Sequence, residues 1–138
     1  MKRSVQILVA ITLMLTSALM VTTVFAARDP FIGSWESIDI DGSYQTLKIG
    51  GGPRNTYNVR YYDYGATICG LDPDTGDFLF AASARGRFTG SGSDLTGSFP
   101  VYCRTHPPTY MLDATVHYVY DASTDTFTDN GGVVWSRR

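Results

Sequence analysis

The chain has 138 residues, a length typical of one domain and not two. It carries 13 acidic and 11 basic residues, which give a formal net charge of −2 at pH 7. This near balance argues against binding to nucleic acid and against attraction to anionic membrane surfaces, because both require clustered lysine and arginine.

The N-terminal residues have the three parts of an export signal. Lys2 and Arg3 give a positive start, and a largely apolar stretch then runs from Val5 to Phe25. Small residues at the two positions that a signal peptidase recognises predict cleavage after Ala26. The alternative is an uncleaved membrane anchor, because the stretch is nearly long enough to span a bilayer. Its threonines and serine make it less apolar than such an anchor, so we expect a helical signal peptide.

Cleavage at this point divides the chain into a signal peptide, residues 1–26, and one secreted or extracytoplasmic domain, residues 27–138. The signal carries two of the eleven basic residues and none of the acidic ones, so nine basic and thirteen acidic residues remain, a net charge of −4. We therefore expect neither a nucleic-acid partner nor membrane association after cleavage.

The rest of the sequence predicts many short strands. Glycine and aspartate recur at short intervals, and the segments between them are rich in Tyr, Val, Thr, Ile and Phe. No segment after the signal keeps an apolar 3.6-residue period for three turns, so we expect no long helix. The predicted strands are 34–40, 44–49, 56–64, 78–83, 86–90, 94–103, 110–120, 124–128 and 133–137.

Two of these strands show clear alternation of side chains. In 56–64, Tyr57, Val59 and Tyr61 share one face. One buried and one solvated face is typical of an antiparallel sheet and not of a parallel one. In 110–120 the predicted inner face is Tyr110, Leu112, Ala114, Val116, Tyr118 and Tyr120, and the outer face is Met111, Asp113, Thr115 and His117.

The fold class that follows is all-β, a small antiparallel β-barrel of about eight strands. Closure into a barrel buries one apolar face of every strand and removes exposed sheet edges. A two-sheet β-sandwich satisfies the same pattern and is the alternative. The barrel is favoured because the connections look sequential, without an obvious long crossover.

Both ends of the predicted domain carry a tryptophan, which suggests that they meet to close the sheet. Gly33-Ser34-Trp35 resembles the Gly-x-Trp opening of calycin barrels, the lipocalin and avidin superfamily. That resemblance implies that Arg137 or Arg138 packs across Trp35. The chain lacks the second lipocalin motif and the biotin-contacting residues of avidins. The run of Trp35, Asp41-Gly42-Ser43, Leu47, Tyr57, the paired cysteines and Asp129…Gly132…Trp135…Arg137 also resembles short exported bacterial β domains of unknown function.

The two cysteines, Cys69 and Cys103, are predicted to form a disulfide, because the export signal places them in an oxidising compartment. Metal ligation is the alternative and would require His106 and His117 as further ligands. No pair among these four has the close spacing of a zinc site, so we predict no metal site.

Segment 72–77 resembles the start of a calcium loop. The twelfth position of such a loop would be Ser83 instead of a glutamate, and neither flank is helical. Aspartate and glycine are also the residues that tight turns select. A turn is therefore the prediction, and a loose surface calcium site is the alternative.

No catalytic or cofactor-binding motif is present. A Gly-x-Ser-x-Gly sequence is absent, and no serine, cysteine or carboxylate is placed by motif beside His106 or His117. We therefore predict a protein that is not an enzyme and needs no cofactor.

Aromatic residues give the strongest functional indication. Tyr57, Tyr61, Tyr118 and Tyr120 share the predicted inner face, and an eight-stranded barrel is just large enough to hold one small ligand. These tyrosines predict non-catalytic binding of a small apolar or amphipathic ligand. In the alternative they form a filled core, and the protein is a module that binds an extracellular protein or interacts with the cell envelope.

Overall fold

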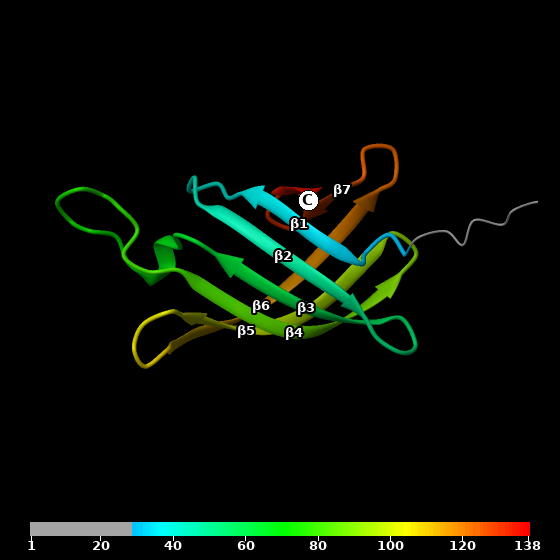
Figure 1. Ribbon diagram of the computed structural model, residues 1–138, viewed down its shortest axis with the longest axis horizontal. Coiled ribbons are helices and arrows are strands. Elements are labelled where there is room, and N and C mark those ends of the chain that lie inside the picture. The colour runs from blue at the N-terminus through cyan, green and yellow to red at the C-terminus, as the bar shows by residue number, and fades with distance from the viewer. Residues whose placement is uncertain (1–28) are drawn as a thin grey trace, which may run out of the picture.

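The computed structural model describes residues 29–138, so the predicted signal peptide and its cleavage site lie outside the described residues. The described chain forms a closed barrel of eight antiparallel strands, in which each strand pairs with the next and β8 pairs with β1 (Figure 1). The predicted all-β antiparallel barrel is confirmed, and the sandwich alternative is excluded. The strands are β1 (Gly33–Ile38), β2 (Tyr44–Gly51), β3 (Thr56–Asp63), β4 (Ala82–Ser91), β5 (Asp94–Cys103), β6 (Thr109–Asp121), β7 (Thr126–Asp129) and β8 (Val134–Arg137).

The structure has fewer strands than the sequence predicts, because the predicted strands 78–83 and 86–90 are replaced by β4. A Cβ atom at Gly86 would lie 2.6 Å from the Ser98 carbonyl oxygen. Glycine at this position therefore permits a close approach between β4 and β5 and does not end the strand. Residues 78–80 lie instead in the connection between β3 and β4, residues 64–81, which we call the rim loop.

The long connections contain almost no helix. Among the described residues, one short 3-10 helix, η1 (Thr67–Cys69), lies in the rim loop. No helix in this part of the chain is long and apolar enough to cross a membrane.

Alternation along the strands fills the barrel with large apolar side chains. In β3, Tyr57 and Val59 are buried while Asn58 and Arg60 are exposed, as predicted. Burial of the larger rings and aliphatic chains provides the main stabilisation of the fold. The largest fully buried side chains are Trp35, Trp135, Tyr118, Phe88, Phe127, Leu47, Leu95 and Val59.

The predicted inner face of β6 is correct near its C-terminal end and wrong at its start. Tyr118 is 1% exposed, but Tyr110 is 52% exposed. The register shifts here, because Val101 pairs with Leu112 whereas the next residue, Tyr102, pairs with Tyr110. This irregularity inserts one extra residue into β6 and turns Tyr110 outward. Its ring then meets that of Tyr102 on the outside, with 5.7 Å between centroids.

One end of the barrel is closed by the segment that precedes β1. The Phe31 ring lies 5.2 Å from the Tyr57 ring and stacks on Phe127 at 5.9 Å. The indole N–H of Trp35 donates to the Phe31 carbonyl at 3.1 Å. These contacts fix Phe31 inside this end, which we call the closed end.

Arg137 holds the two chain ends together at the closed end. Its guanidinium carbon lies 4.1 Å from the centroid of the Trp35 ring. The same guanidinium donates to the carbonyls of Ile32 and Pro30, at 2.8 and 2.9 Å, and pairs with Asp125 at 2.8 Å. Of the two arginines considered for this position, Arg137 occupies it.

The opposite end of the barrel is open. Residues 118–121 of β6 pair with β7, whereas the first nine residues of β6 extend beyond that short strand. The short β7–β8 hairpin therefore leaves most of β6 without a neighbouring strand on this side. We call this the open end; β1, β3, β5 and β7 end there.

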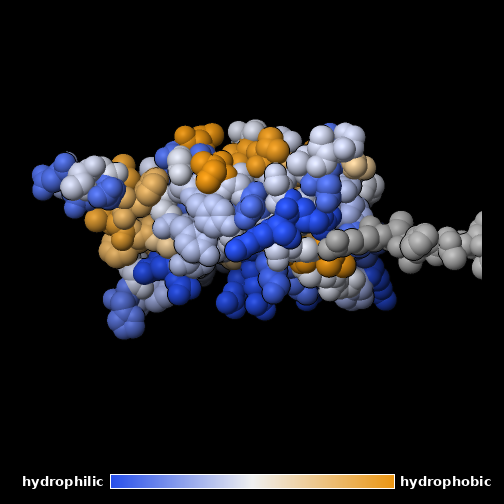
Figure 2. Space-filling model, turned by 45° about the horizontal axis from the view of Figure 1, so that its top comes forward, coloured by the Kyte–Doolittle hydropathy of each residue, from blue (hydrophilic) through white to orange (hydrophobic). Residues whose placement is uncertain are grey.

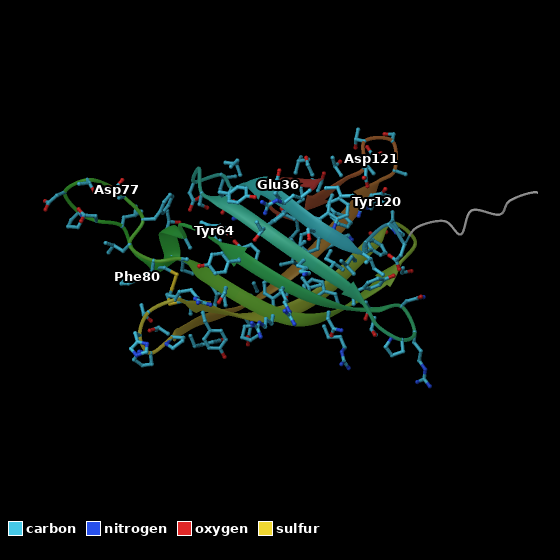
Figure 3. All side chains as sticks on the ribbon, in the orientation of Figure 1. Glu36, Tyr64, Asp77, Phe80, Tyr120 and Asp121 are labelled. Atoms are coloured by element: carbon cyan, nitrogen blue, oxygen red, sulfur yellow. A yellow bond between two sulfur atoms is a disulfide. The ribbon has the colours of Figure 1, made fainter. Side chains whose placement is uncertain are left out.

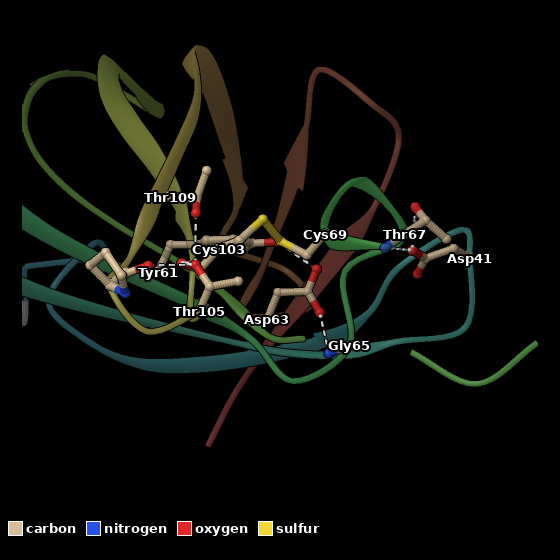
Figure 4. The surroundings of a disulfide bond; sticks show 10 residues. Asp41, Tyr61, Asp63, Gly65, Thr67, Cys69, Cys103, Thr105 and Thr109 are labelled. Atoms are coloured by element: carbon tan, nitrogen blue, oxygen red, sulfur yellow. Dashed lines mark hydrogen bonds between the residues drawn. A yellow bond between two sulfur atoms is a disulfide. The ribbon is translucent and has the colours of Figure 1, made fainter. Parts of the chain in front are cut away.

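A disulfide joins Cys69 to Cys103, as predicted (Figure 4). Cys69 ends η1 in the rim loop, and Cys103 is the last residue of β5. The bond therefore anchors the longest connection of the described chain to the barrel beside the open end. Figure 1 shows the rim loop projecting from this end, on the left of the view.

Candidate functional site

A cavity of about 380 Å³ lies at the open end. Tyr118 and Trp135, each 1% exposed, form its inner limit. Its volume is near the lower limit of the roughly 300–1,000 Å³ typical of small-ligand sites. Apolar and aromatic side chains make up most of the wall, namely Tyr61, Ala82, Phe99, Val101, Leu112, Ala114, Val116 and Val133.

Aromatic rings form one continuous side of this wall. The Tyr61 ring stacks on Phe99 with 5.9 Å between centroids and meets Trp135 edge-on at 6.2 Å. The Tyr61 hydroxyl donates to a carboxylate oxygen of Asp63 at 3.2 Å. Burial raises the pKa of Tyr61, and the negative charge of Asp63 raises that pKa further. The ring therefore stays neutral at physiological pH and presents an apolar surface to the cavity.

Two polar side chains line the cavity without a hydrogen-bond partner among the described residues. Gln45 is 3% exposed and lies on the inward face of β2, in line with Leu47 and Ile49. Within residues 29–138, neither the Gln45 amide nor the Tyr118 hydroxyl makes a hydrogen bond. Burial raises the pKa of Tyr118, and the charge of Asp129 adds to that effect. Both groups can therefore form hydrogen bonds with a molecule in the cavity.

Carboxylates surround the entrance, and two of them accept several hydrogen bonds from the protein. Asp63 accepts a hydrogen bond from the backbone of Gly65 at 3.0 Å as well as from Tyr61. Asp129 accepts from the backbone of Val133 at 3.0 Å and from the indole of Trp135 at 3.1 Å. These two groups shape the wall, and their lone pairs are largely occupied.

Asp39 is the carboxylate at the entrance with the fewest partners. It accepts a hydrogen bond from the backbone N–H of Ile40 at 2.7 Å. Burial raises its pKa, and the like charges of Asp41, Asp63 and Asp129 raise it further. No lysine or arginine is among the described residues that line the cavity. The entrance is consequently electronegative.

The rim loop adds an apolar surface beside this entrance. Thr67 in η1 donates to Asp41 at 3.0 Å, and this contact fixes the loop to the β1–β2 turn on the far side of the disulfide (Figure 4). Figure 2 shows the corresponding hydrophobic area at the left end of the molecule. The exposed apolar side chains of the loop are Tyr64, Ile68, Leu71, Phe78, Leu79 and Phe80, between 37% and 57% exposed.

The four tyrosines predicted to bind a ligand lie at different heights in the barrel. Tyr61 and Tyr118 line the cavity. The Tyr57 hydroxyl donates to Asp29 at 2.8 Å at the closed end, and the Tyr120 hydroxyl donates to Asp125 at 3.0 Å (Figure 3). Four residues of strand correspond to roughly 13 Å, so Tyr57 and Tyr61 share a face without sharing a site.

Sequence reasoning missed several residues of the cavity, above all Gln45, Asp63 and Trp135. The sequence did contain a signal for Gln45 and Asp63. Gln45 has the same parity as Leu47, and Asp63 the same parity as Tyr61, so each is a polar residue at an inward position. Such a residue points to a polar interior wherever a barrel is not completely filled.

The structure places a carboxylate beside His117, which the sequence did not indicate. Asp94 accepts from His117 at 2.6 Å and from the hydroxyl of Ser93 at 3.1 Å. The hydrogen bond from His117 lowers the pKa of Asp94, and that from Ser93 lowers it further. Ser93 donates to the Asp94 carboxylate and not to the His117 imidazole. His117 is therefore not placed to act as a general base on the Ser93 hydroxyl.

Asp72 in the rim loop forms the turn that the sequence favoured. Its carboxylate accepts from the backbone N–H groups of Asp74 and Thr75, at 2.8 and 3.0 Å. These bonds lower its pKa and explain the aspartate at the start of this turn.

Comparison of the chain with protein-family models, curated proteins and solved structures finds no match.

Proposed function

We propose that the protein is a secreted, non-catalytic barrel that binds one small amphipathic ligand in the cavity at its open end. The observation that carries the proposal is an accessible apolar cavity whose wall includes two largely buried polar side chains, Gln45 and Tyr118, without a hydrogen-bond partner among the described residues. A few converging polar groups in an otherwise apolar pocket are typical of small-molecule sites. The resemblance of the chain ends to calycin barrels and the disulfide support the same proposal.

The lining residues define the chemistry of the ligand. An apolar body would lie against Tyr61, Phe99 and Trp135, where burial of apolar surface provides most of the affinity. A hydroxyl, amide or amine on the same molecule would reach Gln45 and the Tyr118 hydroxyl. The carboxylate of Asp39 disfavours an anionic group and favours a neutral or cationic one.

Binding of a neutral fluorescent probe, N-phenyl-1-naphthylamine, tests the apolar part of the site. We expect the probe to gain fluorescence and to quench the emission of Trp135. Ala114→Phe adds a ring to the cavity wall and should abolish binding. Val119→Phe adds the same ring to an exposed, outward position of the same strand and should leave binding unchanged.

Native mass spectrometry of protein purified from its own host tests the proposal without a chosen probe. A retained small molecule should appear in the parent and be absent from Ala114→Phe. Failure of the parent to bind either the probe or a host molecule would contradict the proposal. The exposed apolar side chains of the rim loop would then favour a module that binds a protein or the cell envelope.

The polar groups are tested by Tyr118→Phe and Gln45→Leu. Each change removes a hydrogen-bonding group at nearly constant size, so the fold should be retained. We expect unchanged affinity for the hydrocarbon-like probe. Affinity for a ligand released from the host protein should fall about fivefold, because a hydrogen bond contributes roughly 1 kcal/mol. Equal affinity of both variants for that ligand would show that these groups do not contact it.

A further inference from the structure

Three basic side chains lie directly opposite one another on the outer surface of neighbouring strands. Lys48 of β2 pairs in register with Arg60 of β3, which in turn pairs with Arg85 of β4. All three are exposed. Since adjacent strands are about 4.8 Å apart, the three backbone positions form a row across the sheet. Further basic residues lie beside this row, and the set Lys48, Arg60, Arg85, Arg87, Arg104 and Arg138 is called the basic face.

The row has no acidic partner among residues 29–138. Within the described chain, the side chains of Lys48, Arg60 and Arg85 make no hydrogen bond or ion pair. Glu36, a nearby carboxylate, accepts instead from the Tyr44 hydroxyl at 2.8 Å and lies 3.7 Å from Arg138. Like charges directly opposite one another destabilise a sheet. An anion bound to the row would remove this repulsion.

The basic face also encloses a groove. A hollow of about 590 Å³ on this surface is bordered by Lys48, Arg60, Arg85, Arg104 and Arg138. Figure 2 shows a strongly hydrophilic area across the middle of the barrel. The groove differs from the cavity at the open end in both place and charge, since the described residues of the cavity wall include carboxylates and no lysine or arginine.

Aromatic rings lie in the same groove. Tyr64, 57% exposed, packs against Tyr62 at 4.6 Å and against Tyr44 at 5.3 Å (Figure 3). The guanidinium carbon of Arg104 lies 5.6 Å from the Tyr62 centroid. Accessible tyrosine rings beside several basic side chains are suited to a ligand that alternates apolar ring faces with anionic groups.

We propose that the basic face binds an anionic polysaccharide. The row of charges spans three strands and therefore matches several anionic groups along one polymer, while Tyr62 and Tyr64 contact the faces of its sugar rings. The disulfide is consistent with an extracellular protein, which favours a glycan over a nucleic acid. Composition did not indicate this surface, because its residues are spread over several strands of a chain that is acidic overall.

The test measures binding of fluorescently labelled dextran sulfate and polygalacturonate by anisotropy, over a series of salt concentrations, with uncharged dextran as the comparison polymer. The parent should bind the charged polymers, with affinity that falls steeply as salt rises. Sulfated and carboxylated polymers distinguish the two sources of negative charge. Labelled single-stranded DNA and anionic phospholipid vesicles are measured in parallel.

Matched variants locate the site. Arg60→Gln should weaken binding about fivefold and reduce the dependence on salt, because one charged contact is lost. Arg54→Gln removes the same charge from the exposed β2–β3 turn and should leave binding unchanged. Tyr64→Ala should weaken polysaccharide binding without altering the salt dependence. Arg60→Gln should also melt at a higher temperature than the parent, since it relieves repulsion in the row.

The proposal is overturned if a variant with Lys48→Gln, Arg60→Gln and Arg85→Gln binds the charged polymers as tightly as the parent. Equal binding of uncharged dextran would also overturn it. Tighter binding of DNA or vesicles than of either charged polysaccharide would show that the partner belongs to another class. None of these measurements depends on the cavity at the open end, so this proposal fails or holds independently of the proposed function.

Discussion

At the scale of single residues, Arg137 makes the most varied contacts at the closed end. One guanidinium lies over an aromatic ring, bonds two backbone carbonyls and pairs with a carboxylate. The planar, always charged guanidinium of arginine can make all four contacts at the same time, and the ammonium group of lysine cannot. A single side chain therefore connects β8, the segment before β1 and the β6–β7 turn.

Replacement of Arg137 tests how much this arrangement stabilises the fold. Arg137→Gln should lower the free energy of unfolding by about 2–4 kcal/mol, through loss of the cation–π contact and of charged hydrogen bonds. Arg138→Gln, next along the chain, removes an exposed charge and should cost no more than about 0.5 kcal/mol. Urea denaturation followed by tryptophan fluorescence measures both. Equal stability of the two variants would contradict a special role for Arg137.

Tyr57 gives the closed end a dependence on alkaline pH. Burial, together with the hydrogen bond to Asp29 and the charge of that residue, raises the pKa of Tyr57 from 10.0 to about 12. The folded state thus favours the neutral phenol. Its contribution to stability is complete below pH 10 and is lost as the pH rises towards 12.

Tyr57→Phe tests this dependence. At neutral pH the variant should be less stable than the parent by about 1–2 kcal/mol, because the hydrogen bond to Asp29 is lost. The difference should shrink between pH 10 and 12, where the parent alone loses the contribution of this group. Unfolding curves at a series of pH values measure it. A difference that stays constant through that range would refute the assignment.

At the scale of elements, the short β7–β8 hairpin and the long β6 strand together create the site. A hairpin as long as β6 would cover Leu112, Ala114 and Val116 and close the open end. The rim loop lies at the same end, held by the disulfide, so the most irregular part of the barrel is also the part that borders the cavity.

Removal of the disulfide should affect the open end more than the closed end. The bond joins residues 34 positions apart, and its loss through Cys69→Ala with Cys103→Ala should cost about 3–4 kcal/mol. Hydrogen exchange should rise first in the rim loop, while the amides around Trp35 keep their protection relative to global unfolding. A variant with parental stability, or uniform loss of protection, would show that the bond does not act locally.

The sequence predicted the barrel well because alternation is a property of each strand by itself. Tyr57, Val59 and Tyr61 show which face of β3 is buried, and no knowledge of neighbouring strands is needed. The outward turn of Tyr110 could not be predicted in this way, because it follows from the pairing of β6 with β5. Strand register arises from contacts between distant segments.

The candidate site was predicted in part for the same reason. The odd or even position of a residue along a strand indicates the face on which it lies. It does not indicate how high the residue lies along the barrel axis. Tyr61 and Tyr57 were therefore indistinguishable in sequence, although they lie at opposite ends. Trp135 reaches the cavity through β8, a strand whose position depends on closure, and its contact with Tyr61 has no local signal.

At the scale of the whole molecule, charge is separated by location. Carboxylates gather at the open end around Asp39, and the basic face covers the outside of β2 to β4. A chain with a small net charge can therefore present two surfaces of opposite sign. Composition adds both signs together and so contains no information on this separation; the expectation drawn from it concerned nucleic acid and anionic membranes.

Closure by Arg137 also has a consequence for the order in which the protein can form. Arg137 donates a hydrogen bond to the Ile32 carbonyl, and the two residues are 105 positions apart in the chain. A chain that emerges from the ribosome, N-terminus first, has an unpaired edge on β1 until residues 134–137 have been made. Contacts between such distant residues slow folding, and an unpaired edge invites aggregation. The barrel can therefore close only after the last strand of the chain, β8, has been synthesised.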